Sequence, residues 1–256
     1  MRNVQYFLLD GFESLQSLSI GGYSFDEIST GDCIISNCPL LSNIYFGDYA
    51  FGYYHYFVLQ NVPSLQSITM SQHNFHASNL FGIHRISFIR RWLFLDVPEL
   101  KQSLKTLSIG SYSFRNVIEV NLDGFNELTS LSIGEYAFDS KVGYLSIWNC
   151  SKLQTIAFGR YAFQNADALT LHDLPQLQSI TFNQFAFQNT KTASLNNIGK
   201  IIGLVFSNNC LEKVEYLSIT SKNICIHLLI FRSSWIEESW VKRLFSHRCE
   251  RSRIWR

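Results

Sequence analysis

The sequence predicts a mainly β repeat solenoid, in which short parallel strands stack into two sheets. The segment Leu15–Phe25 (LQSLSIGGYSF) occurs in seven recognisable copies with its apolar residues at fixed places, and two diverged copies follow. The copies begin at residues 15, 41, 65, 104, 128, 153, 177, 201 and 225, so most of them are 24 residues apart. A fixed period of this length is typical of solenoids, whose units bury their apolar faces only against neighbouring units.

The first half of each copy predicts one strand. If the first apolar residue is numbered 0, positions 0, +3 and +5 are apolar, as in Leu15, Leu18 and Ile20. The alternation between +3 and +5 is that of a strand with one buried face. A glycine at +6 in five copies lets the chain leave the strand through a bend that a Cβ atom would crowd. Positions +2 and +4 are mostly Ser and Thr, which suit the water-facing side of stacked strands.

A second apolar alternation precedes each copy and predicts a second strand. Positions −8 and −6 are apolar, as in Phe7 and Leu9, and the pattern assigns Trp92 and Phe94 to the same two rows. Between this strand and position 0, Asp, Asn, Gly and Pro predict a tight turn. Each of about nine coils therefore holds two strands and two corners, and the coils stack into two parallel sheets.

Two aromatic columns accompany the strands. Position +10 is Phe in seven copies, and we expect these rings to form the core, because stacked aromatic side chains hold neighbouring coils together. Position +8 is Tyr in five copies, with His73 and Phe185 in two others. The regularity of this column predicts a structural ladder. A stripe of tyrosines that recognises a partner is the alternative.

The repeat resembles the leucine-rich repeat. Its pattern Leu-x-x-Leu-x-Ile-x-x-x-x-Phe fits that family with Phe in place of the last Leu, and Ile133–Phe138 and Phe158–Phe163 look like the BspA-type subclass of bacteria and protists. The resemblance covers roughly residues 4–235. The chain departs from the family at +8, where the usual Asn is aromatic, and after +10, where the pattern is that of a strand rather than a helix. The resemblance implies a curved solenoid that binds other macromolecules without catalytic residues.

The repeat is interrupted once within the solenoid, which we assign to residues 1–235. The interval between Leu65 and Leu104 is 39 residues, which places an insertion within residues 76–103. Insertions in solenoids map to loops, so we expect a surface loop whose arginines keep it soluble.

Residues 236–256 leave the repeat and form a basic tail. A capping box at Ser234–Glu237 precedes apolar residues that fall on one helical face, including Trp240 and Leu244. We expect a helix that caps the last coil, because terminal units of solenoids need a cover. A helix lying on a membrane surface and a disordered tail are the alternatives.

Composition excludes several classes of protein. The net charge of +1 predicts no generic attraction to nucleic acid, and the chain has no run of 18 apolar residues that would insert stably in a membrane. No signal peptide is visible, so a cytoplasmic location is the default expectation. The six cysteines form no regular framework, and we interpret them as reduced packing residues rather than disulfides or zinc ligands.

Enzyme signatures are missing from the sequence. It contains no nucleophile elbow, phosphate loop, zinc-protease motif or kinase set, so we expect no catalytic residues and no cofactor. The spacing of His73 and His76 would suit two metal ligands, but no third ligand is placed beside them and the aromatic column explains His73. We therefore expect no metal site.

The candidate partner-binding residues lie off the repeat, because Tyr, Trp and Arg supply most of the energy of protein interfaces and flat Ser/Thr ladders supply little. They form two clusters in neighbouring coils: Tyr53, Tyr54 and Tyr56 in one, and Arg85, Arg90, Arg91 and Trp92 in the other. We predict a non-catalytic scaffold that binds a protein partner across coils two to four. A cell-surface or secreted adhesin for a host or matrix protein is the alternative. The exposed edge of the first strand also permits self-association.

Overall fold

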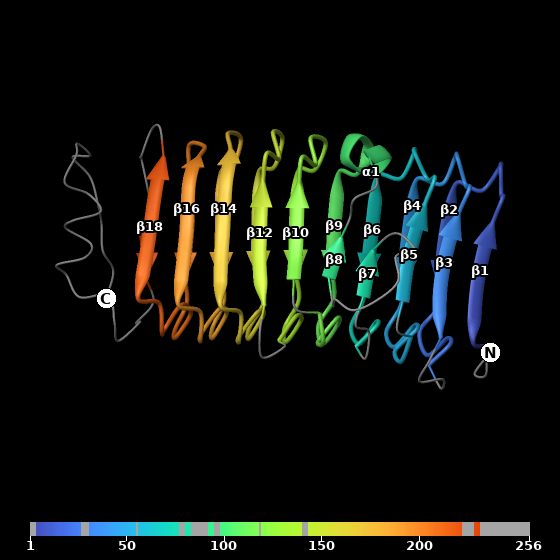
Figure 1. Ribbon diagram of the computed structural model, residues 1–256, viewed down its shortest axis with the longest axis horizontal. Helices are drawn as coiled ribbons and strands as arrows, with labels where there is room; N and C mark the ends of the chain where they lie inside the picture. Colours follow the sequence, from blue (N-terminus) through green and yellow to red (C-terminus); the bar gives the residue numbers. More distant parts are fainter. Residues whose placement is uncertain are drawn as a thin grey trace.

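The chain forms a solenoid of two parallel β-sheets, which confirms the prediction of a mainly β repeat solenoid. The computed structural model describes residues 4–26, 31–54, 56–76, 80–82, 92–94, 98–117, 119–139, 143–221 and 228–230. Figure 1 shows the sheets as two layers, between which the chain passes at two rows of turns. Sheet A has the strand order β1-β3-β5-β7-β8-β10-β12-β14-β16-β18, and sheet B has the order β2-β4-β6-β9-β11-β13-β15-β17-β19.

The strands are short in both sheets. Those of sheet A are β1 (Tyr6–Asp10), β3 (Asp32–Ser36), β5 (Tyr56–Gln60), β7 (Leu80–Gly82), β8 (Trp92–Phe94), β10 (Glu119–Asp123), β12 (Tyr144–Trp148), β14 (Ala168–Leu174), β16 (Thr192–Ile198) and β18 (Tyr216–Ser221). Those of sheet B are β2 (Ser17–Ile20), β4 (Asn43–Phe46), β6 (Ser67–Met70), β9 (Thr106–Ile109), β11 (Ser130–Ile133), β13 (Thr155–Phe158), β15 (Ser179–Phe182), β17 (Gly203–Phe206) and β19 (Leu228–Ile230).

Alternation along the strands places the core between the two sheets. In β12, Leu145 and Ile147 are buried while their neighbours face water, and in β13 the buried pair is Ile156 and Phe158. The inward residues of successive coils align row by row, because the strand pairs are parallel and in register, apart from a shift near the end of the β16–β18 pair. The core is therefore linear, and each coil buries its apolar side chains against the coils on either side of it.

Both aromatic columns stack along the solenoid. The Phe column at +10 is buried, with neighbouring ring centroids 4.8–5.7 Å apart along Phe25, Phe51, Phe75, Phe114, Phe138, Phe163 and Phe187. The column at +8 lies nearer the surface, with spacings of 4.3–5.0 Å along Tyr23, Tyr49, His73, Tyr112, Tyr136, Tyr161 and Phe185. The predicted core column and the predicted structural ladder are both confirmed.

The corner that carries these rings has an unusual backbone. In each of the seven copies the residues at +8 and +10 have positive φ angles, for example 53° at Tyr136 and 56° at Phe138. The left-handed conformation costs a residue with a Cβ atom roughly 1–2 kcal/mol. Each copy bears this cost twice, and the ring stacking between neighbouring coils offsets it. The aromatic columns are therefore part of what holds the corner in shape.

The insertion adds a strand to one sheet only. β7 and β8 both enter sheet A between β5 and β10, whereas in sheet B β6 pairs directly with β9. A short helix, α1 (Pro98–Ser103), precedes β9 and buries Leu100. The expectation of a surface loop is thus wrong for β7, which is part of the sheet, whereas β8 is a strand as the apolar pattern predicted.

The register of β8 also differs from the prediction. Leu93 pairs with Val120, and Trp92 pairs with Glu119, one residue away from the row that the apolar pattern assigned to Trp92. The pattern failed here because three adjacent bulky apolar residues, 92–94, fit either phase of a two-residue alternation. The predicted capping helix after Ser234 lies outside the described residues.

Candidate interaction face

Tyr54, one of the residues that the sequence suggested for partner binding, belongs to the core. Its side chain is fully buried, and its ring lies 5.0 Å from that of Phe51 in an edge-on contact. Its hydroxyl donates a hydrogen bond to the carbonyl oxygen of Val4, two coils away in sequence. Burial raises the pKa of the Tyr54 phenol to about 12. Tyr54 is therefore unable to contact a partner in the folded protein.

The structure describes only some of the other suggested residues. Tyr53 and Tyr56 are exposed, and the Tyr53 ring packs edge-on against His76 with centroids 4.6 Å apart. Tyr56 begins β5 on the outer side of sheet A. Trp92 contributes its backbone to β8, while its side chain lies outside the description. The positions of Arg85, Arg90 and Arg91 also lie outside the described residues, so their proximity to Tyr56 stays a prediction.

The outer side of sheet A exposes apolar side chains at its β1 end. Strands β1, β3 and β5 present three rows there, which we call together the N-terminal face. The rows are Tyr6–Asp32–Tyr56, Leu8–Ile34–Val58 and Asp10–Ser36–Gln60. Tyr6 and Leu8 keep 68% and 62% of their side-chain surface accessible. The middle row is thus entirely apolar although it faces outward.

The same row changes character along the solenoid. Through the register of β7 and β8 it continues from Val58 to Gly82 and the apolar Phe94, and from β10 onward it contains only polar residues: Asn121, Ser146, Thr170, Ser194 and Ser218. Small polar residues are therefore compatible with this position of the coil. An apolar residue is therefore not required at this position. Leu8 is exposed, Ile34 and Val58 are partly buried, and outward apolar residues that adjoin one another in this way are typical of a contact site.

The stretch of chain that contains the N-terminal face is acidic, and two of its acidic residues, Asp10 and Asp32, lie in the rows of the face. Between residues 3 and 84 the chain has no Lys or Arg, and it has six acidic residues, namely Asp10, Glu13, Asp26, Glu27, Asp32 and Asp48. Asp10 lies within the face itself and accepts hydrogen bonds from Ser36 Oγ (2.6 Å) and Asn37 Nδ2 (2.8 Å). These bonds lower the pKa of the Asp10 carboxyl, so that it is ionised at neutral pH.

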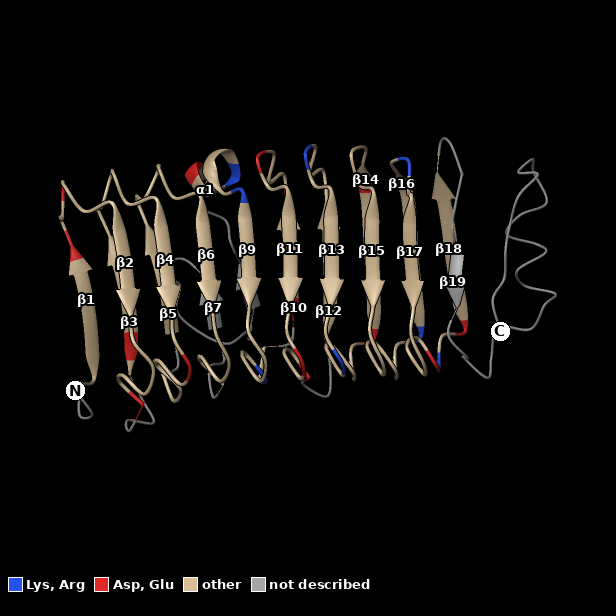
Figure 2. Ribbon diagram, turned by 180° about the vertical axis from the view of Figure 1, so that it is seen from behind, with Lys and Arg blue, Asp and Glu red and all other residues tan. Residues whose placement is uncertain are grey.

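The outer side of sheet B is different. Its strands β2 to β17 contain no Lys, Arg, Asp or Glu, and their ribbons are tan in Figure 2. Its hydroxyl groups bond to one another between coils, as Thr106 Oγ1 does to Ser67 Oγ (3.0 Å) and Thr155 Oγ1 to Ser130 Oγ (3.0 Å). Tyr45 is its exposed aromatic residue. This surface supplies few of the large side chains that anchor protein partners.

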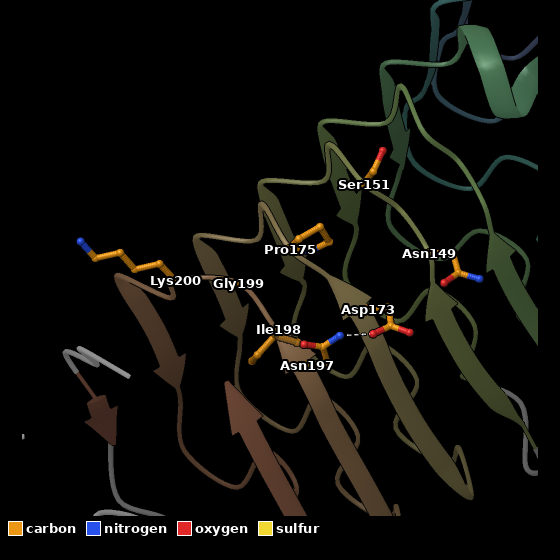
Figure 3. Close-up of a pocket in the computed structure, with 8 residues that line it drawn as sticks. All are labelled: Asn149, Ser151, Asp173, Pro175, Asn197, Ile198, Gly199 and Lys200. Carbon is orange, nitrogen blue, oxygen red and sulfur yellow. Dashed lines mark hydrogen bonds between the residues drawn. The ribbon is translucent and has the colours of Figure 1, made fainter. Parts of the chain in front are cut away.

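A groove of about 490 Å³ lies at the corner where β12, β14 and β16 turn toward sheet B (Figure 3). It is lined by Asn149, Ser151, Asp173, Pro175, Asn197, Ile198, Gly199 and Lys200. Within it, Asn197 Nδ2 donates to Asp173 Oδ1. The other oxygen of this carboxylate lies 2.7 Å from the Nδ1 atom of His172. Asn149 in turn donates to Asp123 (3.2 Å). Its side chains thus form a ladder between coils, and no described nucleophile stands beside a base there.

Metal-binding and reactive groups are not assembled in the described part of the chain. No three His, Cys, Asp or Glu residues are grouped there as metal ligands would be. His73 is stacked between Tyr49 and Tyr112, at 4.3 and 4.6 Å. Four cysteines, Cys33, Cys38, Cys150 and Cys210, are free and buried. Burial raises the pKa of the Cys150 and Cys210 thiols to about 12, which makes them poor nucleophiles.

The chain matches no protein-family model, and neither a curated protein nor a solved structure matches it. The helix that the structure describes, α1, has six residues, and no helix in the described ranges is long and apolar enough to cross a membrane.

Sequence reasoning missed the central residues of the N-terminal face. Leu8, Ile34 and Val58 occupy position −7, between the two core positions at −8 and −6, and were passed over as the outward residues of predicted strands. A comparison of this row across all coils contains the signal, since it is apolar in the first four copies, with Phe94 in the fourth, and polar in the five later ones.

Proposed function

We propose that this chain is a non-catalytic scaffold for protein–protein interaction and that its partner binds the N-terminal face. The observation that carries the proposal is that the middle row is apolar at Leu8, Ile34, Val58 and Phe94 and polar in the described strands from β10 onward. Exposed apolar surface is unfavourable in water by about 25 cal/mol per Å², so its confinement to one stretch of the row implies that it is covered in use.

The geometry of the face suits such a role. Three paired parallel strands form a rigid platform, so that little conformational entropy is lost when a partner binds. Tyr6 and Tyr56 flank the apolar row, and tyrosine is among the residues that supply most interface energy. The resemblance of the repeat to leucine-rich repeats of the BspA type also supports an interaction role, because that family binds other macromolecules.

The test converts the face to the surface that the later coils already carry. In the triple variant Leu8→Ser, Ile34→Thr and Val58→Ser, each new residue is of a type found in this row elsewhere, so the fold is preserved. The wild-type chain and the variant are immobilised and exposed to an extract of the source cells, and retained proteins are quantified by mass spectrometry. We expect the variant to lose at least tenfold in retention of the proteins that bind the wild type.

A matched control changes the same row outside the face. Thr170→Ser alters the outer side of β14 and should leave the retained proteins unchanged. Equal retention by the wild type and the triple variant, with circular dichroism showing both to be folded, would place the contact elsewhere and contradict the proposal.

A further inference from the structure

We infer that the N-terminal face binds the C-terminal segment of a second copy of this chain, residues 236–256, so that copies associate head to tail. The inference rests on the proposed function, since it names a partner for the same face. It follows from charge, from the pattern of apolar residues and from the distance between the two ends of the solenoid.

The charges of the two surfaces are opposite. The stretch that builds the N-terminal face has no Lys or Arg between residues 3 and 84 and six acidic residues. Residues 236–256 contain six basic residues, Lys242, Arg243, Arg248, Arg251, Arg253 and Arg256, and three acidic ones, Glu237, Glu238 and Glu250, for a net charge of +3. Complementary charges of this kind steer association and favour one partner over others.

The apolar residues are complementary as well. Ile236, Trp240 and Leu244 are spaced by four, so in the helix that the sequence predicts they would lie on one side and extend over about 12 Å at 1.5 Å per residue. The apolar row Leu8–Ile34–Val58 crosses three strands, or about 10 Å at 4.8 Å per strand. An amphipathic segment with Trp and Arg residues is the type of partner that such a row anchors.

Distance favours a second copy over the same copy. The strand of the face closest to the C-terminal end is β5, and seven strand spacings of sheet A separate it from β18, or about 34 Å. Residues 231–235 span at most about 17 Å between β19 and the segment. Figure 1 shows β1 and β18 at opposite ends of the stack. A contact of this kind between two different surfaces repeats from copy to copy and forms open chains.

The experiment measures the mass of the full-length chain by sedimentation and light scattering over a range of protein and salt concentrations. We expect the wild-type mass to rise with protein concentration and to fall with salt, because charge contributes to the contact. The face variant (Leu8→Ser, Ile34→Thr, Val58→Ser) and a tail variant (Trp240→Ser, Leu244→Ser) should each associate at least tenfold more weakly when alone. Ser252→Ala is the matched control in the tail and should associate like the wild type.

Mixing the two variants is the decisive step. A face variant retains an intact tail and a tail variant retains an intact face, so the mixture should form dimers and stop there. A synthetic peptide of residues 236–256 should dissociate the wild-type chains, whereas a scrambled peptide should not. A wild type that stays monomeric, a tail variant that still associates, or a mixture that stays monomeric would each overturn the inference. If the face variant nevertheless loses its partners in the extract experiment, the proposed function stands and only this inference fails.

Discussion

The Cα atom of Gly134 packs against the backbone of Ser111 in the preceding coil. A Cβ atom at Gly134 would come within 2.4 Å of the Ser111 nitrogen, a distance that real Cβ atoms do not reach. The same close approach recurs at position +6 of neighbouring coils, where Cβ atoms at Gly110 and Gly159 would lie 2.0 and 2.5 Å from backbone atoms. Glycine at these three positions therefore permits the close approach of consecutive corners in coils four to six.

We predict that Gly134→Ala lowers the free energy of unfolding by about 1–3 kcal/mol, because the added methyl group has to push two coils apart. Gly21 provides the matched control, since it occupies the same position in the first described coil and a Cβ atom there would meet nothing within 4 Å. Gly21→Ala should change stability by less than about 0.5 kcal/mol. Urea denaturation of the two variants measures the difference, and equal effects would contradict the packing argument.

Truncation of the buried aromatic column should be more costly. Phe138 is buried between Phe114 and Phe163, with ring centroids at 5.7 and 4.8 Å. We predict that Phe138→Ala lowers the free energy of unfolding by about 3–5 kcal/mol through the cavity it leaves and the two lost contacts. Phe12→Ala serves as the control, because Phe12 is about half exposed. A Phe138→Ala variant as stable as the control would show that the column does not support the fold.

Stability should fall on mild acidification because of two histidines. Burial lowers the pKa of His73 and of His76 below the ordinary value near 6.5. His76 and Arg115 lower the pKa of His73 further, against the opposing charge of Asp48. Arg115 also lowers the pKa of His76, whereas a hydrogen bond with the His73 backbone opposes that shift. A base with a depressed pKa in the folded state is protonated more readily when unfolded. The contribution of each histidine to the free energy of unfolding is therefore fully present above about pH 6.5 and is lost as the pH falls below that value.

His73→Phe tests this pH dependence, and Phe185 shows that the column accepts Phe. We expect the variant to lose less stability than the wild type between pH 6.5 and pH 5 when the free energy of unfolding is measured by urea denaturation at each pH. Tyr112→Phe, in the next position of the ladder, should leave the pH dependence unchanged, because a tyrosine does not titrate in this range. Identical curves for the wild type and His73→Phe would refute the prediction.

The buried cysteines should resist alkylation. Cys33, Cys150 and Cys210 have pKa values raised by burial, so little thiolate forms at neutral pH and reagents have no access. We predict that iodoacetamide at pH 8 leaves these three residues unmodified in the folded chain and modifies them in urea, as measured by peptide mass spectrometry. Rapid labelling of Cys150 without denaturant would show that its turn opens readily.

Periodic positions could be predicted from the sequence, whereas positions off the repeat were harder to assign. Phe138 and Ile147 were placed in the core because their types recur in every coil. Tyr54 was misjudged because it was read as part of a run of tyrosines rather than by its position, +13, which is buried in later coils at Val117 and Ala166. At Trp92, the insertion changed the spacing of the repeat, so the spacing no longer predicted which residues of β8 and β10 pair. The alternation in the first strand also predicts that Leu8 faces outward. That Leu8 belongs to an outward row with other apolar residues becomes visible only when whole rows are compared.

The insertion leaves the stacking of one wall intact. His73 and Tyr112 are 39 residues apart in the sequence, yet their rings stack at 4.6 Å with an angle of 1° between planes, and Phe75 and Phe114 continue the buried column across the same step. Sheet A, by contrast, accommodates an additional strand, in the manner of an edge dislocation in a crystal. A segment whose length is not a multiple of the repeat can thus be inserted into the solenoid, provided that sheet A takes up the additional strand. The strands of sheet B and the aromatic corner then still stack on their neighbours.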